Sequence, residues 1–347
     1  MNKAYRFRMY PNEEQSVQIE KTVGCCRFVY NQVLALQEEN HRTGCKHLSK
    51  VDANNYVNRE LKEQYSFLKE VDKFALTNAV YALENGYKRF FQKKGGHPNF
   101  KSKHHSGRSY TTNVTNHNIS LGATYIKLPK LGKVKAVIHR KAPENWILKS
   151  ATITKEKDGT YYCAILYEYE AQVESVTIVD DTKVIGLDYK SDGLYMDSDG
   201  RVCGTPQSYR KSQDRLAKAQ RKCRHKKVGS KNYRKQQKKV ARIHRKAANQ
   251  RKDFLHKKST EIANQYPVVC VENLNMRAMS NHGFGNGKAT LDKWYKSSQI
   301  CCKCGNHHKV TLSDRTYRCD CGNVMDRDHN AAINIKREGL RIYREVS

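Results

Sequence analysis

Two segments, Val-Ile-Gly-Leu-Asp at residues 184–188 and Pro-Val-Val-Cys-Val-Glu at residues 267–272, share one pattern. Each is a short apolar run that ends in a carboxylate, which is typical of a strand buried on both faces. A third acid, Asp328, lies in Asp-Arg-Asp-His-Asn-Ala-Ala-Ile-Asn-Ile at residues 326–335, which opens a predicted C-terminal helix. If the two strands are neighbours in one sheet, the three acids converge.

Three carboxylates brought together repel one another, by roughly 4 kcal/mol per close pair at an effective dielectric near 20. Divalent cations relieve that repulsion, and oxygen ligands suit Mg²⁺ or Mn²⁺. Two such ions about 4 Å apart can activate water and stabilise the leaving oxygen in phosphodiester hydrolysis. Asp188, Glu272 and Asp328 are therefore the candidate catalytic and magnesium-binding residues, although each acid alone also fits the role of a turn residue or cap.

A second candidate metal site lies between these segments. Cys301-x-x-Cys304 and Cys319-x-Cys321 are separated by 14 residues. Two cysteine pairs joined by a hairpin supply the four soft ligands of a tetrahedral Zn²⁺ site. Two disulfides are the alternative, but they fit poorly with a chain that shows no signal peptide. Cys302 is expected to be a bystander.

The composition indicates a polyanionic partner. The 347 residues carry 65 Lys and Arg against 34 Asp and Glu, a net charge of +31. The length suggests two or three domains, and a mean hydropathy of -0.85 without a long apolar run excludes membrane proteins. Because residues 1–15 contain no apolar signal segment, we expect a cytoplasmic protein. A ribosome-like accessory or heparin-type binder is the alternative that charge alone leaves open.

The positive charge is concentrated in residues 209–265, where about twenty Lys and Arg stand against two Asp and one Glu. A break at residues 228–230 predicts two antiparallel helices, and we expect them to contact a phosphate backbone rather than to be only a solvated surface. The candidate nucleic-acid-binding residues are Arg108, Tyr110, Lys222, Arg224, Lys226, Lys227, Arg234, Lys238, Arg242 and Arg245.

The N-terminal half combines strands and helices. Residues 3–9 alternate like a strand, and apolar residues at helical spacing predict helices over about 12–40, 52–68 and 72–92. Short strands follow within residues 108–170, with a hairpin at Asp158-Gly159. We expect strand 3–9 to join these strands in an antiparallel barrel into which the helices are inserted.

Several motifs together resemble the OrfB/TnpB family of insertion-sequence proteins. They are VIGLDYK, VVCVENLNMRAMS, SSQICCKCG and DRDHNAAINI, in that order, preceded by YRFRMYPNEEQ…GCCRFVYN and KSKHHSGRSYTT. The resemblance covers nearly the whole chain and implies an RNA-guided DNA endonuclease related to type V CRISPR effectors. It places Asp188, Glu272 and Asp328 at the three catalytic metal-binding positions, with Asp326 as second choice for the third.

The resemblance implies a multidomain α+β protein. Residues 1–10 and 108–180 would form the wedge β-barrel, and 11–107 an inserted helical recognition domain. Residues 181–292 and 326–347 would form an RNase H-like (RuvC) α/β nuclease domain, with a zinc ribbon inserted at 293–325. The implied partners are a guide RNA and a target DNA with a short adjacent motif, and no membrane. The implied location is the cytoplasm of a bacterium, in association with the nucleoid. The sequence carries no indication of oligomeric state.

One departure from the family lies near residue 292, where a helix and a strand of roughly thirty residues are missing. Their loss would remove about four large apolar contacts at ~2 kcal/mol each. We therefore expect weak cleavage, or cleavage that requires bound RNA. One alternative is an RNA-guided DNA-binding protein with lost or weakened cleavage, although all three acids are retained. A second is a DNA transposase or transposase accessory protein, but no His pair accompanies a nucleophilic Tyr.

Overall fold

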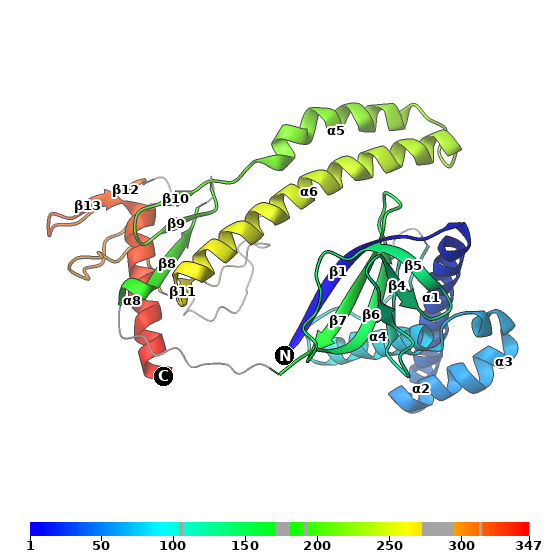
Figure 1. Ribbon diagram of the computed structural model, residues 1–347. Helices are drawn as coiled ribbons and strands as arrows, with labels where there is room; N and C mark the ends of the chain where they lie inside the picture. Colours follow the sequence, from blue (N-terminus) through cyan, green and yellow to red (C-terminus); the bar gives the residue numbers. More distant parts are fainter. Residues whose placement is uncertain (104–106, 171–180, 191–192, 273–294, 312–313, 347) are drawn as a thin grey trace. The chain divides into compact units, whose positions relative to one another are not determined.

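The computed structural model describes residues 1–103, 107–170, 181–190, 193–272, 295–311 and 314–346. The chain forms two compact units, Met1–Gln172 and Val173–Ser347, and Figure 1 shows the elements of each. The loop expected at residues 281–287 and the junction near residue 292 lie outside the described residues.

Unit 1 is built on a seven-stranded antiparallel sheet. Its order is β2-β6-β7-β1-β5-β4-β3. The N-terminal strand lies inside this sheet, paired with β7 along its length and with β5 near its end, which confirms the expectation for residues 3–9. The strands are β1 (Asn2–Tyr10), β2 (Ser109–Asn113), β3 (Ser120–Leu121), β4 (Tyr125–Leu128), β5 (Gly132–Val137), β6 (Ile147–Lys155) and β7 (Tyr161–Glu168).

The expectation of a closed barrel is wrong, because β2 and β3 end the sheet and do not pair with each other. β3 has only two residues, too few for a ladder that would close a barrel. The exposed edge of β2 is instead bound by a helix: Asn78 Nδ2 donates to the Thr111 carbonyl at 2.9 Å and to Asn113 Oδ1 at 3.2 Å. Covering an edge strand in this way satisfies backbone groups that barrel closure would otherwise use.

The helices of unit 1 follow the predicted boundaries closely. They are α1 (Glu13–Arg42), α2 (Lys50–Tyr56), the π turn Val57–Leu61, α3 (Lys62–Gln64), the 3₁₀ turn Ser66–Glu70 and α4 (Lys73–Phe91). A capping box begins α1: Gln15 N donates to Asn12 Oδ1 at 2.7 Å, and Asn12 N donates to Gln15 Oε1 at 3.1 Å. The apolar residues of α1 that recur at helical spacing are buried in the core of the unit, and they are Ile19, Val23, Cys26, Tyr30 and Val33.

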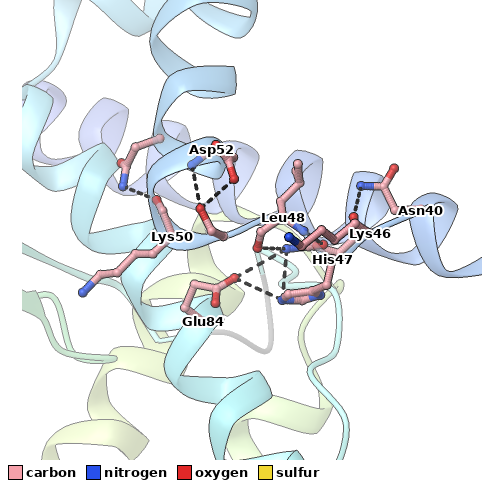
Figure 2. A network of polar contacts seen from close by, with 10 residues as sticks. Asn40, Lys46, His47, Leu48, Lys50, Asp52 and Glu84 are labelled. Carbon is pink, nitrogen blue, oxygen red and sulfur yellow. Dashed lines mark hydrogen bonds and ion pairs between the residues drawn. The ribbon is translucent and has the colours of Figure 1, made fainter.

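A polar network fixes the segment between α1 and α2 (Figure 2). The buried Gln37 side chain donates to the Leu48 carbonyl at 3.0 Å and accepts from the Leu48 amide at 3.0 Å. Next to it, His47 Nε2 lies 3.6 Å from Glu84 Oε1 on α4. The Ser49 hydroxyl caps α2 by accepting from the Asp52 amide. These contacts fasten α2 and α4 to the long helix α1.

Unit 2 contains the two predicted apolar strands. The first is buried as expected, but Val269 and Val271 of the second are exposed, so that strand is not buried on both faces. β8 (Val184–Tyr189) and β11 (Val268–Val271) are parallel neighbours, and β9 (Tyr195–Asp197) and β10 (Val202–Cys203) extend the sheet antiparallel in the order β10-β9-β8-β11. Among the described residues, β11 is the last strand on its side. Helix α8 (Arg327–Val346) packs on β8 and β11, with Val184, Cys270, Ile335 and Leu340 in the shared core.

A glycine allows α8 to lie this close to the sheet. A Cβ atom on Gly186 of β8 would lie 2.2 Å from the Ala332 carbonyl oxygen and 2.7 Å from the Lys336 amide nitrogen. No side chain fits at that separation, so Gly186 sets the height of the helix above the strand. Ala331 and Ala332 are fully buried in this contact.

The basic segment forms the expected pair of helices, α5 (Ser208–Arg224) and α6 (Lys231–Gln265). Gly229, at φ 81°, and the cap Ser230, which accepts from the Tyr233 amide, form the break. Gln236 of α6 donates to the Ala219 carbonyl of α5 at 2.9 Å and pins the two together.

The cysteine module is a short β-hairpin, β12 (Thr316–Arg318) with β13 (Val324–Asp326), which leads directly into α8. No helix among the described residues is long and apolar enough to cross a membrane.

Candidate carboxylate and metal sites

The strand register brings two of the three predicted acids together. β11 pairs with β8 from Val268↔Val184 to Val271↔Leu187, and the next residue of each strand is Glu272 and Asp188. Both acids therefore emerge at the same edge of the sheet, where parallel strands deliver their carboxyl-terminal residues.

The third acid comes from the first turn of α8. Asp328 is buried, and its side chain faces the same edge closely enough that its charge acts on Asp188. Asp326, the second choice, has a different role: its Oδ1 accepts from the amides of Asp328 at 2.8 Å and His329 at 3.2 Å. Asp326 is thus the N-cap of α8, and its carboxylate is engaged by the helix.

Burial and like charge act on Asp188. Burial, followed by the charges of Glu272 and Asp328, raises its pKa to about 7, although the Arg327 guanidinium acts against this rise. Two cations partly neutralise the cluster. Lys190 Nζ lies 3.2 Å from Asp328 Oδ2, and Arg327 Nη2 lies 3.2 Å from Asp328 Oδ1.

Within the described ranges, the four cysteines form a group of possible ligands close enough together to hold a metal ion, and the three acids do not form such a group. Glu272 also accepts a hydrogen bond from the Ser297 hydroxyl, at the start of the cysteine module.

The four predicted cysteines converge and could hold a metal ion. The sulfurs of Cys301, Cys304, Cys319 and Cys321 lie within 4.8 Å of one another. Two of the separations are 3.7 Å (Cys301 to Cys321) and 3.4 Å (Cys304 to Cys319). A tetrahedral ion with metal–sulfur distances of ~2.3 Å needs sulfurs ~3.8 Å apart, so the donor set fits.

The local hydrogen bonds favour thiolate at one of these ligands. Burial opposes ionisation of Cys301, but the amides of Cys304 and Lys303 and the Asn323 side chain lower its pKa to about 6. At Cys319 an amide also favours thiolate, yet burial and the neighbouring sulfurs raise the pKa to about 12. Four thiolates therefore need a cation to coexist.

Cys302 and His308 lie next to the four sulfurs but are not among the four predicted ligands. Cys302 turns away, with its sulfur 3.4 Å from Met325 Sδ, as expected of a bystander. His308 Nε2 lies 3.1 Å from Cys319 Sγ and is placed to donate a hydrogen bond to that sulfur.

Most of the predicted nucleic-acid-binding residues lie on the surface of α5, α6 and their connection. Lys226 and Arg245 are half-buried, and the exposed members are Lys222, Arg224, Lys227, Arg234, Lys238 and Arg242. Arg108 in unit 1 is exposed and lines a cavity of about 500 Å³ together with Arg27, Lys103 and Lys155.

Tyr110 does not fit the prediction. Its side chain is only 6% exposed and belongs to the core of unit 1. It has no free face on which a base could stack, so we withdraw Tyr110 as a contact residue.

Sequence reasoning missed four kinds of residue: the cation Lys190, the hydroxyl Ser297, the asparagines of α8 and His308. A signal was present for some of them. Asn330 and Asn334 are four residues apart on the apolar face of a helix, where buried amides require partners, and both are almost fully buried.

The raised pKa of Asp188 generates a pH prediction. The folded protein holds this proton more tightly than the unfolded chain does, so the contribution of Asp188 to stability is present below about pH 4 and is lost as the pH rises through 7. Without added divalent cation, Asp188→Asn should therefore stabilise unit 2 more at pH 8 than at pH 5, by up to about 2.5 kcal/mol. Thermal unfolding midpoints of both proteins at the two pH values test this. An equal difference at both would contradict it, and Mg²⁺ should stabilise the wild type selectively at pH 8.

Three family models match the chain. One described as "Probable transposase" (OrfB_IS605) matches residues 164–282, and one described as a Cas12f1-like TNB domain matches residues 287–335. A third, described as a helix-turn-helix domain, matches residues 1–46, where this chain has one strand and one uninterrupted helix of 30 residues. A Cas12f ternary complex solved by cryo-EM covers 93% of this chain and 81% of its own at 13% identity, with a TM-score of 0.33.

Two curated relatives match over nearly the whole chain. The "Putative RNA-guided DNA endonuclease" of Streptomyces pristinaespiralis is 30% identical over 371 residues, covering 98% of this chain and 90% of the relative. The "Putative RNA-guided DNA endonuclease InsQ" of Escherichia coli K12 is 28% identical, covering 97% and 92%. By this similarity the chain belongs to the OrfB/TnpB family of insertion-sequence proteins, which is related to Cas12.

Proposed function

We propose that this protein is an RNA-guided DNA endonuclease of a transposable element. The observation that carries the proposal is the register that sets Asp188 beside Glu272, with Asp328 delivered to the same edge by α8. The names of the two curated relatives support it. The partners are a guide RNA, whose pairing reads the sequence, and a target DNA with a short adjacent motif.

The finer architecture follows from the same proposal. Three antiparallel strands, a parallel fourth and a helix packed on them support an RNase H-like (RuvC) nuclease domain at residues 181–292 and 326–347. Residues 293–325 are the zinc ribbon inserted in it. Residues 1–10 and 108–180 form the wedge, and residues 11–107 form the helical recognition domain.

In the nuclease site, Asp188, Glu272 and Asp328 would hold Mg²⁺ or Mn²⁺. The bound cations supply an activated water and neutralise the charge that develops on the leaving oxygen. The protein's own part is to hold three carboxylates at fixed positions despite their repulsion. The ammonium of Lys190 pairs with Asp328, so it would share that carboxylate with a bound cation.

The alternative of a guided DNA-binding protein without cleavage rests on the expected shortening. In the part of the sheet that the structure describes, β11 has a neighbour on one side only. A strand held on one side is less firmly placed, and Glu272 follows that strand. Binding without cutting by the wild type would favour this alternative.

The catalytic proposal predicts a difference between two neighbouring acids. Asp188→Ala and Asp328→Asn should lower DNA cleavage to about one hundredth or less of the wild-type rate, because ligands matter at least as much as their outer-shell partners. Asp326→Asn should retain cleavage, since asparagine also caps helices. Each protein, with its copurified RNA, is assayed for plasmid cleavage in Mg²⁺ and for target binding. Equal cutting by Asp188→Ala and the wild type would contradict the assignment.

The cysteine cluster predicts about one zinc per chain. Cys301→Ser should lose the zinc and destabilise the module, because structural zinc contributes roughly 10–16 kcal/mol of binding energy in small domains. Cys302→Ala, the adjacent control, should retain it. Metal analysis of freshly purified protein checks both, and zinc-free folded wild type would contradict the prediction.

The basic helices predict a change in salt dependence. Replacing the exposed Lys222, Arg224 and Lys227 by Ala should weaken nucleic-acid binding irrespective of sequence. It should also reduce the slope of log K against log salt by about 0.9 per lost phosphate contact. Lys257→Ala is the control, because its ammonium already pairs with Asp253 at 2.8 Å on the same helix. An unchanged slope in the triple variant would show a merely solvated surface.

A further inference from the structure

A hydrogen bond links the carboxylate site to the cysteine module. The Ser297 hydroxyl donates to Glu272 Oε1, and Ser297 is only 6% exposed. Ser297 stands four residues before the metal ligand Cys301. The same small segment therefore contacts a catalytic acid at one end and the sulfur cluster at the other.

Helix α8 holds this segment through two buried asparagines. Asn334 Nδ2 donates to the carbonyls of Ser297 at 2.8 Å and Ile300 at 2.7 Å. Asn330 Nδ2 donates to the Ile300 carbonyl at 2.7 Å. Buried amides with these partners cannot move without leaving polar groups unsatisfied, so the segment is fixed to the helix.

The metal ligand itself lies between two of the anchored residues. Asn330 Oδ1 accepts from the Cys302 amide at 2.9 Å, and the Arg337 guanidinium donates to the Cys302 carbonyl. Cys301 thus has an anchored residue on each side. The helix that anchors them also carries Asp328, so one connected set of contacts joins the sulfur cluster, Ser297, Glu272 and Asp328.

The hydrogen bond from Ser297 restricts the position of the Glu272 side chain. Glu272 follows the end of β11, a strand with a described neighbour on one side only, and its side chain has three rotatable bonds. A hydroxyl that binds one carboxylate oxygen removes part of that freedom and leaves the other oxygen for a cation. Outer-shell partners of this kind commonly orient metal ligands.

We propose that Ser297 is a positioning residue for Glu272, and that metal binding by the cysteine cluster raises the affinity of the carboxylate site for divalent cations through Ser297. The inference rests on the proposed function, because it takes Glu272 as a metal ligand. It makes the cysteine module part of the nuclease centre as well as a structural insert.

The test measures Mn²⁺ binding by full-length, zinc-loaded protein with its copurified RNA, using calorimetry, with Asp188→Ala defining binding at the carboxylate site. Ser297→Ala should weaken Mn²⁺ affinity about tenfold and keep its zinc. Ser297→Thr, which keeps the hydroxyl, and Ser298→Ala, the adjacent control, should stay within about twofold of the wild type. Unchanged affinity in Ser297→Ala would overturn the proposal.

Zinc removal tests the route of the coupling. Zinc-free wild type should lose about the same factor in Mn²⁺ affinity as Ser297→Ala, and zinc-free Ser297→Ala should lose no more. If removing zinc from Ser297→Ala weakened Mn²⁺ binding by the same factor again, zinc would act by a route that does not include Ser297. That result would overturn the coupling.

The wild type alone gives a reciprocal test that does not depend on a variant folding. By thermodynamic linkage, saturating Mn²⁺ should raise zinc affinity by the same factor, and no effect on zinc affinity would overturn the coupling. These binding measurements do not depend on DNA cleavage. A wild type that shows the coupling but cuts no DNA would refute the proposed function alone.

Discussion

The close packing of α8 across the parallel pair β8 and β11 is the constraint on which the rest of unit 2 depends. It requires Gly186, because any side chain there would meet the backbone of Ala332 and Lys336. With the helix at this height, its first turn reaches the edge where Asp188 and Glu272 emerge. The apolar contacts of the helix stabilise an arrangement that the three carboxylates alone would oppose.

The repulsion among the three carboxylates affects the groups of the site. The pKa of Asp188 rises to about 7, and the Asp328 carboxylate is shared by Lys190 and Arg327. The fold thus holds carboxylates together against their mutual repulsion. Local destabilisation of this kind is common where binding is the function.

Much of this organisation could be predicted from sequence, because it is encoded locally. The apolar run ending in Asp188, the break at Gly229-Ser230, the cap at Asn12 and the cysteine spacing each depend on residues within one element or turn. The structure contains each of them. The convergence of Asp188 and Glu272 also follows once the two strands are assumed to be parallel neighbours. Each acid comes directly after the apolar run of its strand, so both acids lie at the same end of the sheet.

The features that escaped prediction depend on contacts between distant segments. The sheet of unit 1 stays open, with β2 and β3 at its ends, and Asn78 of α4 binds the edge of β2 from a distant segment. Tyr110 has an aromatic ring beside basic residues, yet its place in β2 turns it into the core. Ser297 binds Glu272, which lies 25 residues earlier in the chain, and Asn334 of α8 binds Ser297 across 37 residues. Periodicity within one element cannot predict hydrogen bonds between such distant residues.

The most direct measurement of the central claim is the structure of the RNA-bound protein with Mn²⁺, with the ions located by their anomalous scattering. The account predicts manganese bound by Asp188, Glu272 and Asp328, with Lys190 drawn away from Asp328 and the Ser297–Glu272 hydrogen bond retained. Manganese absent from this edge of the sheet, with Lys190 still paired to Asp328 at saturating Mn²⁺, would contradict it.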